Sequence, residues 1–309
     1  MSLENFIICI PTHKRENEKE QRTIKWLPES LYDKVYFFTD ETRADLLKHI
    51  VPAKCNIVPV PQELGIKGIA GKRQFIVEWA NRNGFQKIWQ IDDSVDLCEN
   101  VGLHPTLQAG PQLLRIKEKD KLIPLLQEMS NLLDDYPLAG HLNRSGTYQQ
   151  RIKSPNVYEH QENKRMYTSL GINTKFFVEN DIRFDYLQNK YGDDSLSLME
   201  DYTVQLQLLT KGFKTIQIGT WCFDKASFSG KGGCADERNI ERQKNVCDKL
   251  HETFPDYVKV VEAKDETKKE SVKYNVQISW KKLSDIGKVP EVSKQSEQSK
   301  EPAKVIDEW

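Results

Sequence analysis

The chain has 309 residues, of which 38% are hydrophobic and 29% are charged, a composition typical of a globular protein with a sizeable core. Its formal net charge of −1 argues against a protein that holds nucleic acid through overall positive charge. A local basic groove on a neutral protein is still compatible with such a substrate. The sequence contains no apolar run of the roughly 20 residues that a membrane-spanning helix needs.

The beginning of the chain and its cysteines bear on where the protein resides. The first predicted strand begins at Phe6, which leaves no room for a secretory signal peptide. The cysteines are scattered and form no CxxC pair, which favours reduced thiols over a disulfide scaffold or a zinc ribbon. We therefore expect a cytoplasmic protein. The sequence gives no indication of an oligomeric state.

Strand and helix patterns alternate in the first third of the chain, which predicts a mostly parallel sheet covered on both faces. Short apolar runs predict strands over residues 6–10, 35–39, 56–60 and 87–91, and helical spacing predicts helices over 43–49 and 68–81. In such sheets ligands bind at the carboxyl ends of the strands. The polar residues that follow the strands are therefore the first candidates for a functional site.

The remainder of the chain has a less regular pattern. We expect helices over residues 121–133, 201–211 and 237–254, strands over 138–142, 215–218 and 272–280, and two short strands or a strand and a turn within 166–177. From about residue 284 the chain is rich in Ser, Lys, Glu, Gln and Pro, which predicts a disordered tail over 284–309.

Two aspartates, Asp92 and Asp93, directly follow the predicted strand 87–91. Adjacent carboxylates repel each other unless a cation or a hydrogen-bond donor lies between them. Mg²⁺ and Mn²⁺ take oxygen ligands and share their shell with substrate phosphates, so one carboxylate can bind metal while the other accepts a ribose hydroxyl. The alternative is a helix N-cap with a first-turn acid, which also favours Asp. The pair alone does not decide between these interpretations.

A second acid pair, Glu200 and Asp201, opens the predicted helix 201–211. Acids are common at helix N-termini, which is the structural interpretation. The functional one is that a carboxylate here takes the proton of an attacking hydroxyl as general base. The acidic loop at residues 192–195 (GDDS) is a weaker candidate.

A glycine-rich segment at residues 229–233 (SGKGG) has the free backbone amides of a loop that closes over phosphates. Lys231, followed by Arg238 and Arg242, could neutralise a leaving diphosphate. The segment lacks the spacing of a Walker loop, and a flexible surface linker is the alternative. His13 and His141 are lone histidines, which are more often structural than ligands.

Taken together, these segments resemble the GT-A type of glycosyltransferase. Their order is a strand ending in PTHKR, helix GKRQFIVEWA, strand and turn IWQIDDS, helix MEDYTVQLQLL and the glycine-rich loop. The resemblance covers residues 6–254 and implies an α/β, Rossmann-like, mostly parallel sheet flanked by helices, with a smaller acceptor-side subregion. Asp92-Asp93 stands at the position of the DxD-type metal motif, and Glu200-Asp201 resembles the ED element that carries the base in inverting members. Because the first two acids are adjacent rather than spaced as D-x-D, the role of each stays open.

More narrowly, residues 171–185 (GINTKFFVENDIRFD) followed by MEDYTVQ are similar to phage glycosyltransferases grouped as TET-associated. That likeness implies a UDP-sugar donor, 5-hydroxymethylcytosine in phage DNA as acceptor, glucosyl or arabinosyl transfer, and location in the host cytoplasm. A flipped base would have to reach Asp201. The residues that could assist it by charge or stacking are Lys153, Lys164, Arg165, Lys175, Tyr148, Tyr158 and Tyr167.

The resemblance leads to specific roles. We expect one catalytic domain over residues 1–283, with 1–100 binding the nucleotide sugar and 101–283 forming the acceptor side and lid. Asp93 is expected to bind Mn²⁺ or Mg²⁺ with Asp92 beside it, and Asp201 to be the base, with Glu200 structural or a hydrogen-bond acceptor. The residues expected to bind the donor are Pro11, Thr12, Arg15, Lys72, Arg73, Asp92, Gly230, Lys231, Gly232 and Gly233.

Other functions are compatible with parts of this pattern. The acceptor could instead be a saccharide or a protein. A nucleotidyltransferase also pairs acids after a strand, but it would carry a glycine-rich basic signature after the first strand, where PTHKRENEKE has no glycine. A non-catalytic nucleotide-sugar-binding module would not need both acid pairs.

Overall fold

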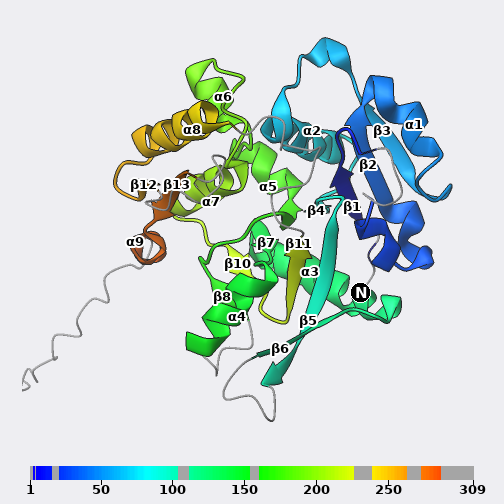
Figure 1. Ribbon diagram of the computed structural model, residues 1–309. Coiled ribbons are helices and arrows are strands. Elements are labelled where there is room, and N and C mark those ends of the chain that lie inside the picture. The colour runs from blue at the N-terminus through cyan, green and yellow to red at the C-terminus, as the bar shows by residue number, and fades with distance from the viewer. Residues whose placement is uncertain are drawn as a thin grey trace, which may run out of the picture.

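The computed structural model describes residues 3, 5–15, 21–103, 111–153, 160–225, 239–262 and 273–286. Its central element is an eight-stranded mixed sheet with the strand order β3-β2-β1-β4-β9-β7-β10-β8 (Figure 1). The first four in this order are parallel: β1 (Phe6–Pro11), β2 (Val35–Asp40), β3 (Asn56–Val60) and β4 (Lys87–Ile91). Strand β9 (Ser169–Asn173) runs antiparallel to β4 and to β7 (Leu138–Gly140). The sheet ends with β10 (Ile216–Gln217) and β8 (Gln161–Glu162).

Both faces of this sheet are buried, and β1 shows how. Phe6, Ile8 and Ile10 pack in one apolar cluster with α3 (Leu122–Asp135), whereas Ile7 and Cys9 pack in another with α2 (Gly68–Arg82). Successive side chains of a strand point to opposite faces, so a strand buried on both sides is apolar throughout. The α/β class and the mostly parallel sheet flanked by helices are therefore confirmed, as are the strands predicted at 56–60 and 87–91.

A smaller antiparallel sheet, with the order β11-β5-β6, was not predicted. It consists of β5 (Val95–Leu103), β6 (Pro111–Arg115) and β11 (Trp221–Lys225). The register of β11 against β5 pairs Lys225 with Val95. The end of β11 therefore lies beside the turn that joins β4 to β5.

The two sheets are flanked by α1 (Ala44–Lys48), α4 (Arg144–Lys153), α5 (Thr174–Glu179) and α7 (Glu200–Thr210), and α6 (Tyr186–Tyr191) packs beside α7 (Figure 1). Helix α8 (Ile240–Thr253), the hairpin β12 (Val258–Glu262) with β13 (Tyr274–Ile278), and α9 (Trp280–Asp285) share a third apolar cluster with α6 and α7. No helix in the described ranges combines the length and apolarity needed to cross a membrane.

One expectation about secondary structure was wrong. Residues 166–177 form β9 followed by helix α5, because the side chain of Asn173 accepts a hydrogen bond from the amide of Phe176 and begins a helix there. Helix α9 continues to Asp285, past the predicted start of the tail at 284, because Leu283 is buried in the third cluster. Residues 287–309 lie outside the described part of the chain.

Candidate active site

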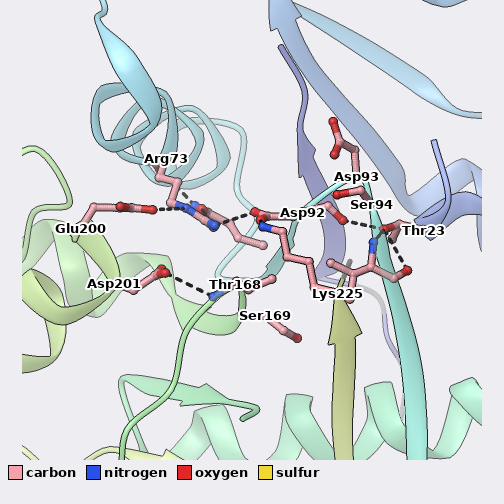
Figure 2. Close-up of polar contacts among 12 residues, drawn as sticks. Thr23, Arg73, Asp92, Asp93, Ser94, Thr168, Ser169, Glu200, Asp201 and Lys225 are labelled. Atoms are coloured by element: carbon pink, nitrogen blue, oxygen red, sulfur yellow. Dashed lines mark hydrogen bonds and ion pairs between the residues drawn. The ribbon is translucent and has the colours of Figure 1, made fainter. Parts of the chain in front are cut away.

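The turn Asp92-Asp93-Ser94 lies at the carboxyl end of β4 and is fixed by Thr23. The hydroxyl of Thr23 donates to the backbone carbonyl of Asp92 at 2.5 Å and accepts from the amide of Val95 at 3.0 Å. The amide of Thr23 donates to the carbonyl of Asp93 at 3.0 Å. These bonds fix the backbone of the turn, from which the side chains of Asp92 and Asp93 extend (Figure 2). The turn is not a helix N-cap, because β5 follows it directly.

The carboxylate of Asp93 points toward the segment that follows β1. One oxygen accepts a hydrogen bond from the hydroxyl of Thr12 at 2.9 Å, and the other contacts the guanidinium of Arg15, which also donates to Ser94 Oγ at 2.6 Å. Gln21 supports this arrangement by donating to Thr12 Oγ1 at 3.0 Å and to the carbonyl of Arg15 at 2.9 Å. Burial raises the pKa of Asp93 more than the charge of Arg15 lowers it.

The carboxylate of Asp92 points the other way, between α2 and β11. Oδ1 accepts a hydrogen bond from Nη2 of Arg73 at 2.8 Å, and Oδ2 contacts the ammonium group of Lys225. Burial alone would raise the pKa of Asp92, but Lys225 and Arg73 outweigh it and hold the pKa below its usual range. Asp92 therefore loses its proton more readily than Asp93 does.

Arg73 connects the two acid pairs that lie far apart in the sequence. It is only 1% exposed, and besides Asp92 its Nε donates to Oε1 of Glu200 at 3.1 Å and its Nη1 to Oε1 of Gln90 at 3.3 Å. Glu200 begins α7, and burial and the neighbouring Asp201 raise its pKa to about 8. The carboxyl end of β4 and the start of α7 thus form one site, with the buried guanidinium of Arg73 at its centre.

Asp201 has one carboxylate oxygen that is not satisfied. Oδ2 accepts from the amide of Thr168 at 3.3 Å, whereas Oδ1 is buried without a hydrogen-bond partner among the described residues. Burial raises the pKa of Asp201 more than the charge of Arg73 lowers it. Two residues beside it, Thr168 and Met199, have positive φ angles of 67° and 60°, which are uncommon for residues with a side chain. Such strain and such an unpartnered oxygen are typical of functional sites.

Lys72 lies on the same helix as Arg73 but serves a separate cluster. Its ammonium donates to the carbonyl of Thr12 at 3.0 Å and to Asp40 at 2.9 Å, and His13 contacts the same carboxylate at 2.6 Å. Burial would raise the pKa of Asp40, but the bonds from His13 and Lys72 prevail and lower it far below its usual range. His141, expected to be structural, is fully buried and bonded to Ser169 at 2.8 Å, and burial lowers its pKa to about 4.

The structure thus brings Thr12, Arg15, Arg73, Asp92, Asp93, Glu200 and Asp201 together, with Pro11 at the end of β1 beside them. The predicted loop residues Gly230, Lys231, Gly232 and Gly233 lie outside the described residues, as does Arg238. Arg242 contacts Ser195 and Ser197 instead. Sequence reasoning missed Thr23, Gln21 and Lys225, since none belongs to a motif; only the unpredicted sheet brings Lys225 to Asp92.

The acid pairs offer carboxylate oxygens, which are the ligands that Mg²⁺ and Mn²⁺ prefer. No group of three or more His, Cys, Asp and Glu side chains in the described ranges is arranged to hold a metal ion. Two carboxylates are nevertheless enough for Mg²⁺ or Mn²⁺ when substrate phosphates complete the shell. All four carboxylate oxygens of Asp92 and Asp93 have donors. An ion would therefore bind where Lys225 moves away from Oδ2 of Asp92 or Arg15 moves away from Oδ1 of Asp93.

Comparison with known proteins assigns the chain to a family. A family model described as TET-Associated Glycosyltransferase matches residues 6–233, which include both acid pairs. The chain belongs to this family. The family is one of glycosyltransferases, and the segment 171–185 also lies within the matched region. No curated protein matches the sequence.

Solved structures give more distant likenesses. GalNAc-T7 with UDP, GalNAc and Mn²⁺ is 12% identical, with a TM-score of 0.46 over 71% of this chain and 43% of that one. Residues 1–349 of TarS from S. aureus, in complex with UDP, are 12% identical, with a TM-score of 0.41 over 80% of this chain and 65% of that one. This chain therefore spans less than two thirds of each.

Proposed function

We propose that this glycosyltransferase transfers a glucosyl or arabinosyl group, with inversion, from a UDP-sugar to the hydroxymethyl group of 5-hydroxymethylcytosine in DNA. The observation that carries the proposal is the buried Arg73, which joins Asp92 at the end of β4 to Glu200 at the start of α7. A donor-binding acid and a base beside an acceptor must lie within one site, and Arg73 holds these two pairs together.

On the donor side, we propose that Thr12, Arg15 and Lys72 hold the nucleotide after β1. Asp93 would bind Mn²⁺ or Mg²⁺ with Asp92 beside it, and the ion would stabilise the negative charge that develops on the departing UDP. Arg73 is buried among protein acids, so its proposed role is to position Asp92 rather than to contact the donor. Lys231 and the glycines around it are proposed to approach the diphosphate.

On the acceptor side, we propose that Oδ1 of Asp201 takes the proton of the acceptor hydroxyl. The hydroxyl oxygen attacks the anomeric carbon as the bond from that carbon to the diphosphate oxygen breaks, and UDP leaves. Glu200 accepts a hydrogen bond from Arg73, whereas Oδ1 of Asp201 has no partner among the described residues and is therefore the oxygen that can receive a proton. The raised pKa of Asp201 makes it a stronger base once ionised.

Aromatic side chains beside Asp201 support a nucleobase as the acceptor. Tyr202 follows it in the chain, Tyr167 precedes Thr168, and the guanidinium of Arg165 lies 4.8 Å from the ring centroid of Tyr167 and 5.2 Å from that of Tyr202. Stacking on aromatic rings and a nearby positive charge are how enzymes hold a flipped base. Lys164 is proposed to contact the DNA backbone. Lys175 follows the end of β9 that pairs with Lys87, which is the opposite end of β4 from Asp92. The side chains of Lys153 and Tyr158 lie outside the described set.

The acceptor is tested by incubating the protein with 5-hydroxymethylcytosine DNA, a panel of UDP-sugars and Mn²⁺, and identifying nucleosides by mass spectrometry. DNA with unmodified cytosine is the matched control. We expect a nucleoside heavier by one pentose or hexose in the modified DNA only. Transfer to saccharide or protein without transfer to DNA would refute the proposed acceptor.

The base is tested with Asp201→Asn, which keeps the shape of the side chain and removes its basicity. We expect transfer to fall by about 10²- to 10⁴-fold, whereas UDP binding, measured by calorimetry, stays at the wild-type level. Asp256→Asn, at an exposed acid outside the site, is the control. Near wild-type turnover in Asp201→Asn would remove Asp201 as the base.

The metal is tested with Asp93→Ala and heat stabilisation by UDP in the presence and absence of Mn²⁺. Wild-type protein is expected to gain more stability from UDP with Mn²⁺ than without it. Asp93→Ala should lose that additional gain, whereas Asp256→Ala should keep it. An unchanged response in Asp93→Ala would contradict a metal at this residue.

A further inference from the structure

The ammonium group of Lys225 occupies one oxygen of the acid that is proposed to lie beside the metal. Lys225 ends β11 and pairs in register with Val95, three residues after Asp92. From there its side chain reaches Oδ2 of Asp92, while Arg73 approaches Oδ1 from α2 (Figure 2). Each oxygen of Asp92 therefore has its own cationic partner.

The two partners of Asp92 are not equally replaceable. The side chain of Arg73 is 2% exposed and is also bonded to Glu200 and Gln90, so it cannot withdraw without leaving buried polar groups unpaired. The side chain of Lys225 is 29% exposed, so its ammonium can turn into water. Oδ2 is therefore the oxygen of Asp92 that can change partners.

The ammonium group of a lysine resembles a hydrated metal ion more closely than the guanidinium group of an arginine does. It is a compact point charge on a flexible stem, whereas arginine presents a flat, rigid fork. An ammonium on a carboxylate oxygen disfavours a divalent cation on the same oxygen, because like charges at that distance repel strongly. Binding of either one to Oδ2 therefore weakens binding of the other.

We propose that Lys225 and the divalent cation compete for Oδ2 of Asp92, with Lys225 neutralising the acid while no ion is bound. The inference rests on the proposed use of a metal by this site. Lys225 is thus a positioning residue that holds the carboxylate of Asp92 in place. This contact lowers the affinity of the wild-type protein for the bare ion, because the ion binds only the fraction of molecules in which Lys225 has left the oxygen.

The experiment is a calorimetric titration with Mn²⁺ alone. Lys225→Met removes the ammonium and keeps most of the stem, and we expect it to bind Mn²⁺ roughly tenfold more tightly than wild-type protein. Arg144→Met is the charge-matched control. Its guanidinium lies 3.6 Å from Asp224, the residue before Lys225, and does not contact Asp92. We expect the Mn²⁺ affinity of this control to rise less than about threefold, because the charge of Arg144 acts on the ion only through space and dissolved salt screens it.

A second readout follows Lys225 itself in the wild-type protein. An amine-acylating reagent, with mass spectrometry of the labelled peptides, should modify Lys225 faster when Mn²⁺ is present. Lys121, which pairs with Glu99 at 3.3 Å, is the internal reference and should not change. Unchanged or slower labelling of Lys225 would overturn the competition.

The outcomes separate this inference from the metal proposal. Binding of Mn²⁺ to wild-type protein without tightening in Lys225→Met, or with equal tightening in Arg144→Met, refutes the competition alone. Absence of Mn²⁺ binding in every variant, with or without UDP, refutes both. Binding in Lys225→Met and none in wild-type protein supports competition in its strongest form.

Discussion

Arg73 is the residue whose replacement should reveal most about this site. It lies on the buried side of α2, is 1% exposed, and bonds to Asp92 at 2.8 Å, Glu200 at 3.1 Å and Gln90 at 3.3 Å. Arg73→Met fills similar space without a charge. It leaves Asp92 with Lys225 as its remaining cationic contact among those described, and it leaves Glu200 and Gln90 without their donor.

The cost follows from burial. Removal of one partner from a buried ion pair costs about 3–5 kcal/mol, because the remaining charge is desolvated and uncompensated. The contact between Lys225 and Asp92 compensates part of this loss, so we expect a decrease in unfolding free energy near the lower end of that range. Arg82→Met, on the exposed last turn of the same helix, should change the unfolding free energy by less than about 0.5 kcal/mol.

The assay is denaturant unfolding near pH 7 for a double-mutant cycle of Arg73→Met and Asp92→Asn. Since Asp92→Asn removes the charge that Arg73 compensates, the double variant should be more stable than the sum of the single losses predicts, by about 1–3 kcal/mol. A loss below about 1 kcal/mol in Arg73→Met, or strictly additive losses, would show that Arg73 is not the centre of the site.

Two further expectations concern stability. Because burial raises the pKa of Glu200 from 4.5 to about 8, the folded chain holds this proton more tightly than the unfolded chain. The contribution of this proton to stability is complete below about pH 4.5 and is lost as pH rises through 8. The unfolding free energy of wild-type protein should therefore fall over that window, and it should fall less in Glu200→Gln. Equal pH profiles would contradict the raised pKa. Gly140→Ala should lower the melting temperature, because a Cβ there would lie 2.8 Å from the carbonyl oxygen of Ser169. We expect a loss of about 1–3 kcal/mol in unfolding free energy, and an unchanged melting temperature would contradict that packing.

Where strands and helices form in the first third of the chain could be predicted, and the reason is local. Residues 6–10 and 87–91 are apolar throughout because the sheet is buried on both faces, and helix 68–81 was recognised from its spacing and extends only one residue further in the structure. The second sheet escaped prediction because β5 carries Asp96, Glu99 and Asn100, which break the pattern of a buried strand.

For the site, the sequence alone indicated two candidate acid pairs by position and type: Asp92-Asp93 after a buried strand and Glu200-Asp201 at a helix start. Strand ends and helix starts are local features, so the sequence can reveal them. Only the tertiary structure decided how these acids are joined and charged. Arg73 lies 127 residues from Glu200, and Lys225 lies 133 residues from Asp92, yet both pairs are in contact. Ionisation depends on burial and on neighbouring charges that folding brings together, and no local pattern records either.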